Sequence, residues 1–143
     1  MLKPAWTLLY DSDCGFCKWI VSGLLVLDRE RALVPSAIQS PEGAELLGDL
    51  DPAARLASVH LIAPDGERLS AGAVAAPLLR LLPGGSVPAR AVARAPRLTG
   101  RAYQWVADHR TQISKAVPAA MKRRASARVQ RAEAERAAPS RRR

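Results

Sequence analysis

The chain has 143 residues, of which 48% are hydrophobic and 24% charged, so it can fold as one domain with its own core. No apolar run approaches the roughly 20 residues of a membrane span, and two cysteines are too few for a disulfide scaffold. The net charge of +9 comes entirely from residues 101–143, because residues 1–100 are neutral. No convincing signal peptide follows Met1, so a cytoplasmic location is the default expectation.

The first part of the chain predicts alternating strands and helices. Apolar patterning favours a buried strand over residues 6–10, a helix from about 14 to 28 and a second short strand over 33–35. Two helix starts follow, Ser40-Pro41 and Asp51-Pro52, where a capping side chain precedes a proline at the first helical position.

The middle of the chain predicts a hairpin and then helices. Residues 58–63 and 67–70 are typical of strands, and Pro64-Asp65-Gly66 between them is typical of a tight turn. Residues 73–82 have a helical pattern that ends at a Pro-Gly-Gly sequence, and a short helix is expected near residues 88–95.

The last third predicts one amphipathic helix and a basic tail. Thr99 is expected to cap a helix whose apolar stripe, from Tyr103 to Val117, contains one charged member, Arg110. Residues 119–143 are mostly Ala, Arg, Glu and Ser, so we expect an exposed helix or a disordered tail beyond a domain of residues 1–118.

The order of these elements indicates an α/β fold. Strands joined by helices run parallel with right-handed crossovers, and the hairpin adds an antiparallel pair. A mixed sheet of about four strands flanked by helices, with a helical C-terminal extension, is the layout of a thioredoxin-like domain.

A C-x-x-C motif directly follows the first predicted strand and opens the first helix. Its spacing places Cys14 and Cys17 on one helical turn, where unpaired N–H groups and the helix dipole favour a thiolate. Cys14 is the predicted nucleophile and Cys17 the more buried resolving thiol. Gly15 leaves the approach to the sulfur atoms open, and Phe16 offers a substrate an apolar contact.

Two acids precede the motif. A carboxylate of Asp11 or Asp13 near Cys14 would raise the pKa of that thiol, and a buried acid can exchange a proton with Cys17. The simpler alternative is that Asp13 or Ser12 only caps the helix.

The cysteines have two alternatives to redox chemistry, a zinc site and an inert pair. A zinc site needs about four ligands, and the remaining histidines, His60 and His109, have no partnering spacing. An inert structural pair is a further alternative, whereas thiol redox chemistry is favoured. The sequence indicates no metal site and no cofactor.

The motif and several other segments resemble the DCC family, small bacterial proteins predicted to be thiol–disulfide oxidoreductases. Residues 9–17 contain its D-x-x-C-x-x-C signature, and the resemblance covers roughly residues 6–115. The other matching segments are Gln39-Ser40-Pro41-Glu42-Gly43, Asp65-Gly66, Gly72-Ala73 and residues 102–110.

The resemblance implies a thioredoxin-like fold and redox activity at Cys14 and Cys17, with Asp11 as the signature acid. One departure from true thioredoxins concerns substrate binding. Those proteins place a cis-proline just before the third strand, where this chain has Ser58-Val59. A narrow range of thiol or disulfide substrates is therefore expected.

The tail leaves a second class of function open. Residues 122–143 carry a net charge of +7 without aromatic residues, which suits salt-dependent binding to nucleic acid, an anionic membrane surface or an acidic partner. The alternative is a tail that only solubilises. A non-catalytic binding or scaffold module with structural cysteines thus stands beside the oxidoreductase.

Overall fold

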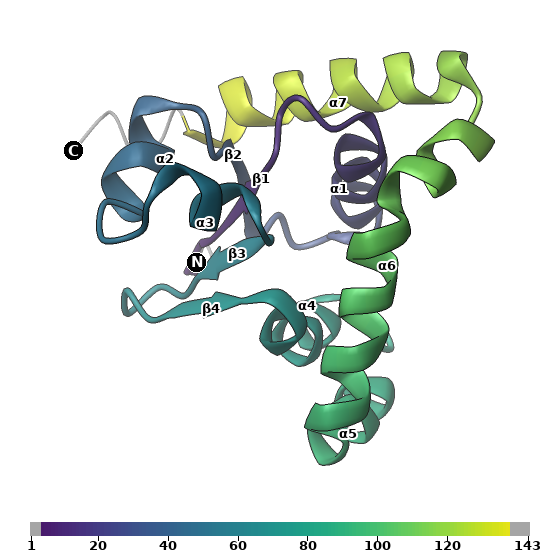
Figure 1. Cartoon of the computed structure of the whole chain (residues 1–143). Helices are drawn as coiled ribbons and strands as arrows, with labels where there is room; N and C mark the ends of the chain where they lie inside the picture. The colour runs from purple at the N-terminus through teal and green to yellow at the C-terminus, as the bar shows by residue number, and fades with distance from the viewer. Residues whose placement is uncertain (1–3, 138–143) are drawn as a thin grey trace.

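The computed structural model describes residues 4–137, which form a four-stranded sheet with helices on both faces (Figure 1). The four strands lie where the sequence predicts them. They are β1 (Trp6–Tyr10), β2 (Leu33–Ala37), β3 (His60–Ile62) and β4 (Arg68–Ser70).

Helices fill most of the intervening chain and, apart from short connections, residues 71–137. They are α1 (Gly15–Leu27), α2 (Pro41–Leu46), α3 (Pro52–Leu56), the 3₁₀ turn η1 (Ala71–Val74), α4 (Ala75–Leu81), α5 (Ser86–Arg94), α6 (Pro96–Ala116) and α7 (Ala119–Ala137). The predicted caps of α2 and α3 are confirmed. Ser40 Oγ accepts a hydrogen bond from Gly43 N–H at 3.0 Å, and Asp51 Oδ1 accepts one from Ala54 N–H at 2.8 Å.

The sheet is mixed, in the order β2-β1-β3-β4. Strand β1 is parallel to β2 and antiparallel to β3, and β3 forms the predicted hairpin with β4. At the centre of β1, Leu8 lies opposite Pro35 on one side and Leu61 on the other. The predicted α/β class and its mixed sheet are therefore confirmed.

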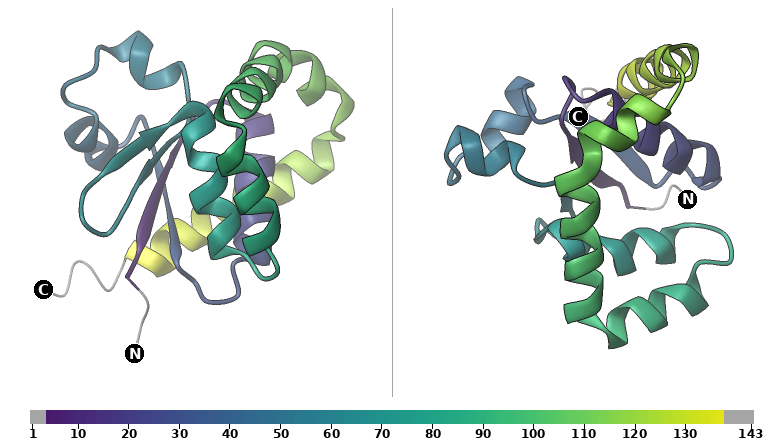
Figure 2. Two further views of the ribbon diagram at one scale, coloured as in Figure 1. Left: turned by 90° about the horizontal axis from the view of Figure 1, so that it is seen from below. Right: turned by 45° about the vertical axis from the view of Figure 1, so that its right-hand side comes forward.

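Alternating residues of β1 face two different cores. Leu8 and Tyr10 pack with residues of α1, η1 and α7, whereas Leu9 packs with Ile38 and with Leu47 beside α2. The sheet is thus covered by the α1 and α7 layer on one face and by the α2 region on the other (Figure 2).

The expected start of α6 is wrong by four residues, because the N-cap is Ala95 and not Thr99. Its first turn begins at Pro96, because proline presets a helical torsion and gives up only an N–H that has no partner at this position. Thr99 lies inside the helix, and its Oγ1 donates to the Val92 carbonyl at 3.2 Å.

The expected helical form of the C-terminal extension is confirmed for α7, but this helix is not fully exposed. This helix packs along α1 and β2, and its Val129 side chain is fully buried. The other buried residues of α7, Ala125 and Ala132, have small side chains that let the two helices approach closely, so little apolar content is enough for packing. The remaining part of the predicted tail, residues 138–143, lies outside the described residues.

Among the helices of residues 4–137, none combines the length and the apolar character that a membrane crossing requires.

Candidate active site

Cys14 occupies the N-cap of α1. Its backbone is extended, and its Sγ accepts a hydrogen bond from the Cys17 N–H at 3.2 Å. An N-cap side chain meets the unpaired N–H groups of the first turn, so the sulfur lies at the positive end of the helix dipole. The alternative caps considered from the sequence, Ser12 and Asp13, are wrong, because Cys14 takes this position itself.

The two sulfur atoms are in direct contact. Cys17 Sγ donates to Cys14 Sγ at a distance of 2.6 Å, and both cysteines are free and half-buried. This hydrogen bond lowers the pKa of Cys14 to about 6, with further help from the Cys17 N–H and the charge of Arg110. Burial and the Asp11 carboxylate oppose the shift. Cys14 is therefore the thiol that ionises first.

The pKa of Cys17 moves in the opposite direction. Donating its proton to Cys14 raises the pKa of Cys17, and burial and the neighbouring thiolate raise it further. Two like charges this close cannot both form easily, so the pair holds one proton between two sulfur atoms. Cys14 is thus the more acidic thiol of the pair, and Cys17 is the thiol that keeps its proton.

Helix α6 supplies two residues that the sequence did not assign to the site. Arg110 acts on both sulfur atoms through its positive charge. The Tyr103 hydroxyl accepts a hydrogen bond from the Val59 N–H at 3.0 Å, and burial, together with the nearby Cys17, raises the pKa of this tyrosine. The only signal in the sequence was that Arg110 interrupts an apolar stripe.

Asp11 and Asp13 differ in how they are held. Asp11 Oδ1 accepts hydrogen bonds from the Asp13 N–H at 2.9 Å and from Gln39 Nε2 at 2.7 Å, which fixes the turn before Cys14. Asp13 is exposed, with Gln39 Nε2 at 3.5 Å from its Oδ2. Asp11 is thus the acid whose charge reaches the sulfur atoms, and Gln39 is a neighbour that sequence reasoning missed.

The two residues between the cysteines are more enclosed than expected. Phe16 is buried, with its ring 6.2 Å from that of Trp19, so it belongs to the wall of the site rather than to its surface. A Cβ on Gly15 would lie 3.1 Å from Cδ of Lys122, a residue of α7. The approach that Gly15 leaves open is therefore partly covered by the Lys122 side chain.

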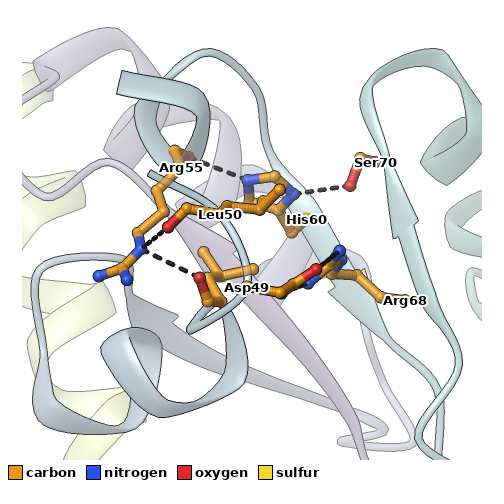
Figure 3. A network of polar contacts seen from close by, with 7 residues as sticks. Asp49, Leu50, Arg55, His60, Arg68 and Ser70 are labelled. Carbon is orange, nitrogen blue, oxygen red and sulfur yellow. Dashed lines mark hydrogen bonds and ion pairs between the residues drawn. The ribbon is translucent and has the colours of Figure 1, made fainter. Parts of the chain in front are cut away.

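The histidines weighed as zinc ligands are engaged elsewhere. His60 is buried, and its ring nitrogens lie 2.7 Å from Ser70 Oγ and 2.9 Å from the Arg55 carbonyl (Figure 3). His109 stacks on Trp105 of α6 at a centroid distance of 4.4 Å. Among residues 4–137, no three His, Cys, Asp or Glu side chains gather as a metal site would require.

A free dithiol at the N-terminus of the first helix, beside a mixed four-stranded sheet, defines the thioredoxin-like class of protein. The model of the family described as DCC1-like thiol-disulfide oxidoreductase matches residues 8–116, and the chain belongs to this family. No curated protein and no solved structure matches the chain. Helix α7 lies beyond the matched residues.

Proposed function

We propose that the chain catalyses thiol–disulfide exchange, with Cys14 as the nucleophile and Cys17 as the resolving thiol. The observation that carries this proposal is the 2.6 Å contact in which Cys17 donates its proton to the Cys14 sulfur at the helix N-terminus. A pKa of about 6 leaves Cys14 mostly as thiolate at neutral pH, which is the form that attacks disulfides.

The reaction proceeds in two exchanges. The Cys14 thiolate attacks one sulfur of a substrate disulfide, forming a mixed disulfide and releasing the other substrate sulfur as a thiolate. Cys17 then loses its proton and attacks Cys14, which closes the Cys14–Cys17 disulfide and releases the second substrate thiol. Two electrons pass from the protein to the substrate, and the reverse sequence oxidises a dithiol.

Two acids have supporting roles in this proposal. Asp11 is positioned to oppose the Cys14 thiolate and to exchange a proton with Cys17, since its charge reaches both sulfur atoms. Asp13 contributes its backbone N–H, which holds the Asp11 carboxylate.

Thiol and disulfide compounds are the proposed substrates. We place the protein in the cytoplasm, because a chain with only two cysteines needs no oxidative folding.

A redox titration tests the proposal. The purified protein is equilibrated in glutathione or dithiothreitol buffers, alkylated, and read by mass. A reversible two-electron transition between dithiol and disulfide is expected, and its midpoint gives the favoured direction. A pair that never closes would leave the alternative, a binding module with structural cysteines.

The two serine variants separate the roles of the cysteines. Cys14→Ser is expected to lower the rate of exchange with a model disulfide at least a thousandfold, because the attacking thiolate is lost. Cys17→Ser keeps the attack and accumulates the mixed disulfide, which mass spectrometry detects. Equal behaviour of the two variants would contradict the assignment of nucleophile and resolving thiol.

A further inference from the structure

A groove runs between α1 and α7 on the surface of the protein. The two helices lie side by side and run in the same direction, since Lys18 bonds to Ser126 and Asp28 to Arg136 (Figure 2). The groove consists of two adjoining hollows of about 400 and 290 Å³, and Arg128 lines both of them.

The two walls of this α1–α7 groove differ in chemistry. The α1 wall presents Ile20, with Trp19 beside it, and Val26 further along the helix. Ile20 is 43% exposed and Val26 is 58% exposed. The α7 wall presents guanidinium groups, from Arg124, Arg128 and Arg131, and Met121 extends the apolar side at one end.

The positive charge of the α7 wall is largely uncompensated. Within residues 4–137, Arg124 and Arg131 make no hydrogen bond or ion pair, and Arg128 donates to the neutral Ser22 Oγ at 2.9 Å. The acid that lines the groove, Glu135, already pairs with an arginine of the loop after α1 at 3.4 Å. An anionic group entering the groove would therefore meet free cationic partners.

We propose that the α1–α7 groove binds an acidic amphipathic helix of a partner protein. A helix fits because the trough between two adjacent helices accepts the side-chain ridge of a third. Its apolar residues would cover Ile20 and Val26, while its carboxylates would face Arg124 and Arg131. The span from Trp19 to Val26 is about 10 Å, two turns of a helix with anchors at positions i, i+3 and i+7.

The shape of the groove favours a peptide over a membrane surface. A flat bilayer would touch the two rims and leave both hollows unfilled, whereas a helix places side chains into them. The residues that line the groove include neither cysteine, so this binding does not depend on the proposed redox function.

The first experiment uses a synthetic probe with the full-length chain. The probe is a peptide of about four helical turns, with Leu along one face and Glu on both flanks. Calorimetry at about 0.15 M salt is expected to give a Kd below about 100 μM. A scrambled peptide of the same composition, which has the charge without the apolar face, is expected to bind at least tenfold more weakly.

Charge-reversal variants locate the site. The double variant Arg124→Glu/Arg131→Glu is expected to weaken probe binding at least tenfold. The matched control, Arg123→Glu/Arg94→Glu, makes the same change in net charge at exposed positions outside the groove and is expected to alter Kd less than twofold. Ile20→Ser tests the apolar wall, with a loss of about fivefold. Circular dichroism verifies that each variant is folded.

Three results would overturn the proposal. The first is equal binding of the scrambled peptide, and the second is an equal loss in both double variants, since each would show only general charge attraction. The third is binding to vesicles of anionic phosphatidylglycerol without binding to the peptide, which would assign the surface to a membrane. The outcome is separable from the redox titration, because binding is measured equally well in Cys14→Ser.

Discussion

The two helices that lie side by side on the sheet, α1 and α7, reach their packing by different means. Helix α1 buries large apolar side chains such as Val21 and Leu25. Helix α7 buries one valine, Val129, between two alanines and is held at its end by the Arg136 guanidinium. A helix with little apolar content can therefore dock through small buried residues and a long polar side chain that reaches a buried carboxylate.

The polar contacts of α7 reach the core and the site. The Tyr10 hydroxyl donates to Glu133 at 2.6 Å, and the buried Asp28 carboxylate accepts from Arg136 at 2.7 Å. Near the cysteines, Lys122 lies over Gly15 and donates to the Ser114 carbonyl at 3.0 Å. The helix beyond the family match therefore supports the helix that carries the dithiol.

The largest effect is expected from removing the Arg136 guanidinium, which holds the end of α7. Arg136→Ala is expected to lower the free energy of unfolding by about 3 kcal/mol, because it leaves the Asp28 carboxylate buried without its cation. Urea unfolding followed by circular dichroism measures the change. Arg31→Ala is the matched control, since Arg31 forms a mostly exposed pair with Glu135 and should cost less than about 1 kcal/mol. Equal costs would show that burial of the pair is unimportant.

The apolar contribution of α7 is expected to be smaller. Val129→Ala removes two methyl groups from a fully buried site and should cost about 2 kcal/mol through lost burial and the cavity left behind. Val87→Ala changes the same groups at a position that is 72% exposed and should cost less than about 0.5 kcal/mol. A negligible cost at Val129 would mean that α7 is held by its polar contacts alone.

The sheet and α1 could be predicted because their signals are local. A short apolar run predicted β1 and apolar residues at helical spacing predicted α1, and Ser40-Pro41 and Asp51-Pro52 identified the starts of α2 and α3. The packing of α7 could not be predicted, since the partners of Arg136 and Glu133 lie more than 100 residues earlier in the chain. No local pattern contains such a pairing.

Only part of the site could be predicted, because some of its residues come from elements that are distant in the sequence. The spacing and position of Cys14 and Cys17 were local and placed both sulfur atoms on the first turn. The roles of Tyr103 and Arg110 depend on how α6 lies against α1, which the sequence does not specify. The covering of Gly15 by Lys122 depends on α7 in the same way.

The pH at which Cys14 ionises tests the reactivity that α1 gives this thiol, which is separate from how the helix packs. Its alkylation rate should rise about tenfold per pH unit below 6, reach half its maximum at about pH 6 and level off above pH 7. Because this pKa is lower in the folded state than in the unfolded state, the thiolate also stabilises the reduced protein as pH rises from 6 to about 8.5. Stability relative to Cys14→Ser checks this sign.

The denatured chain is the control for this measurement. In urea both cysteines should react with a midpoint near about 8.5, the value for a free thiol. A midpoint of 8 or above in the folded protein would contradict the thiolate at Cys14, and with it the main support for a nucleophile.

The smallest expected effects concern the two charges that act on Cys14 from different elements. Arg110→Gln should raise the pKa of Cys14, and Asp11→Asn should lower it, each by less than about one unit, because the Arg110 cation favours the thiolate and the Asp11 carboxylate opposes it. Asparagine keeps an oxygen that can accept from the Asp13 N–H, so the turn is preserved. Arg101→Gln, an exposed position on α6, should leave the alkylation profile unchanged. Shifts of the same sign in both variants would mean that local shape, rather than charge, sets the reactivity of the thiol.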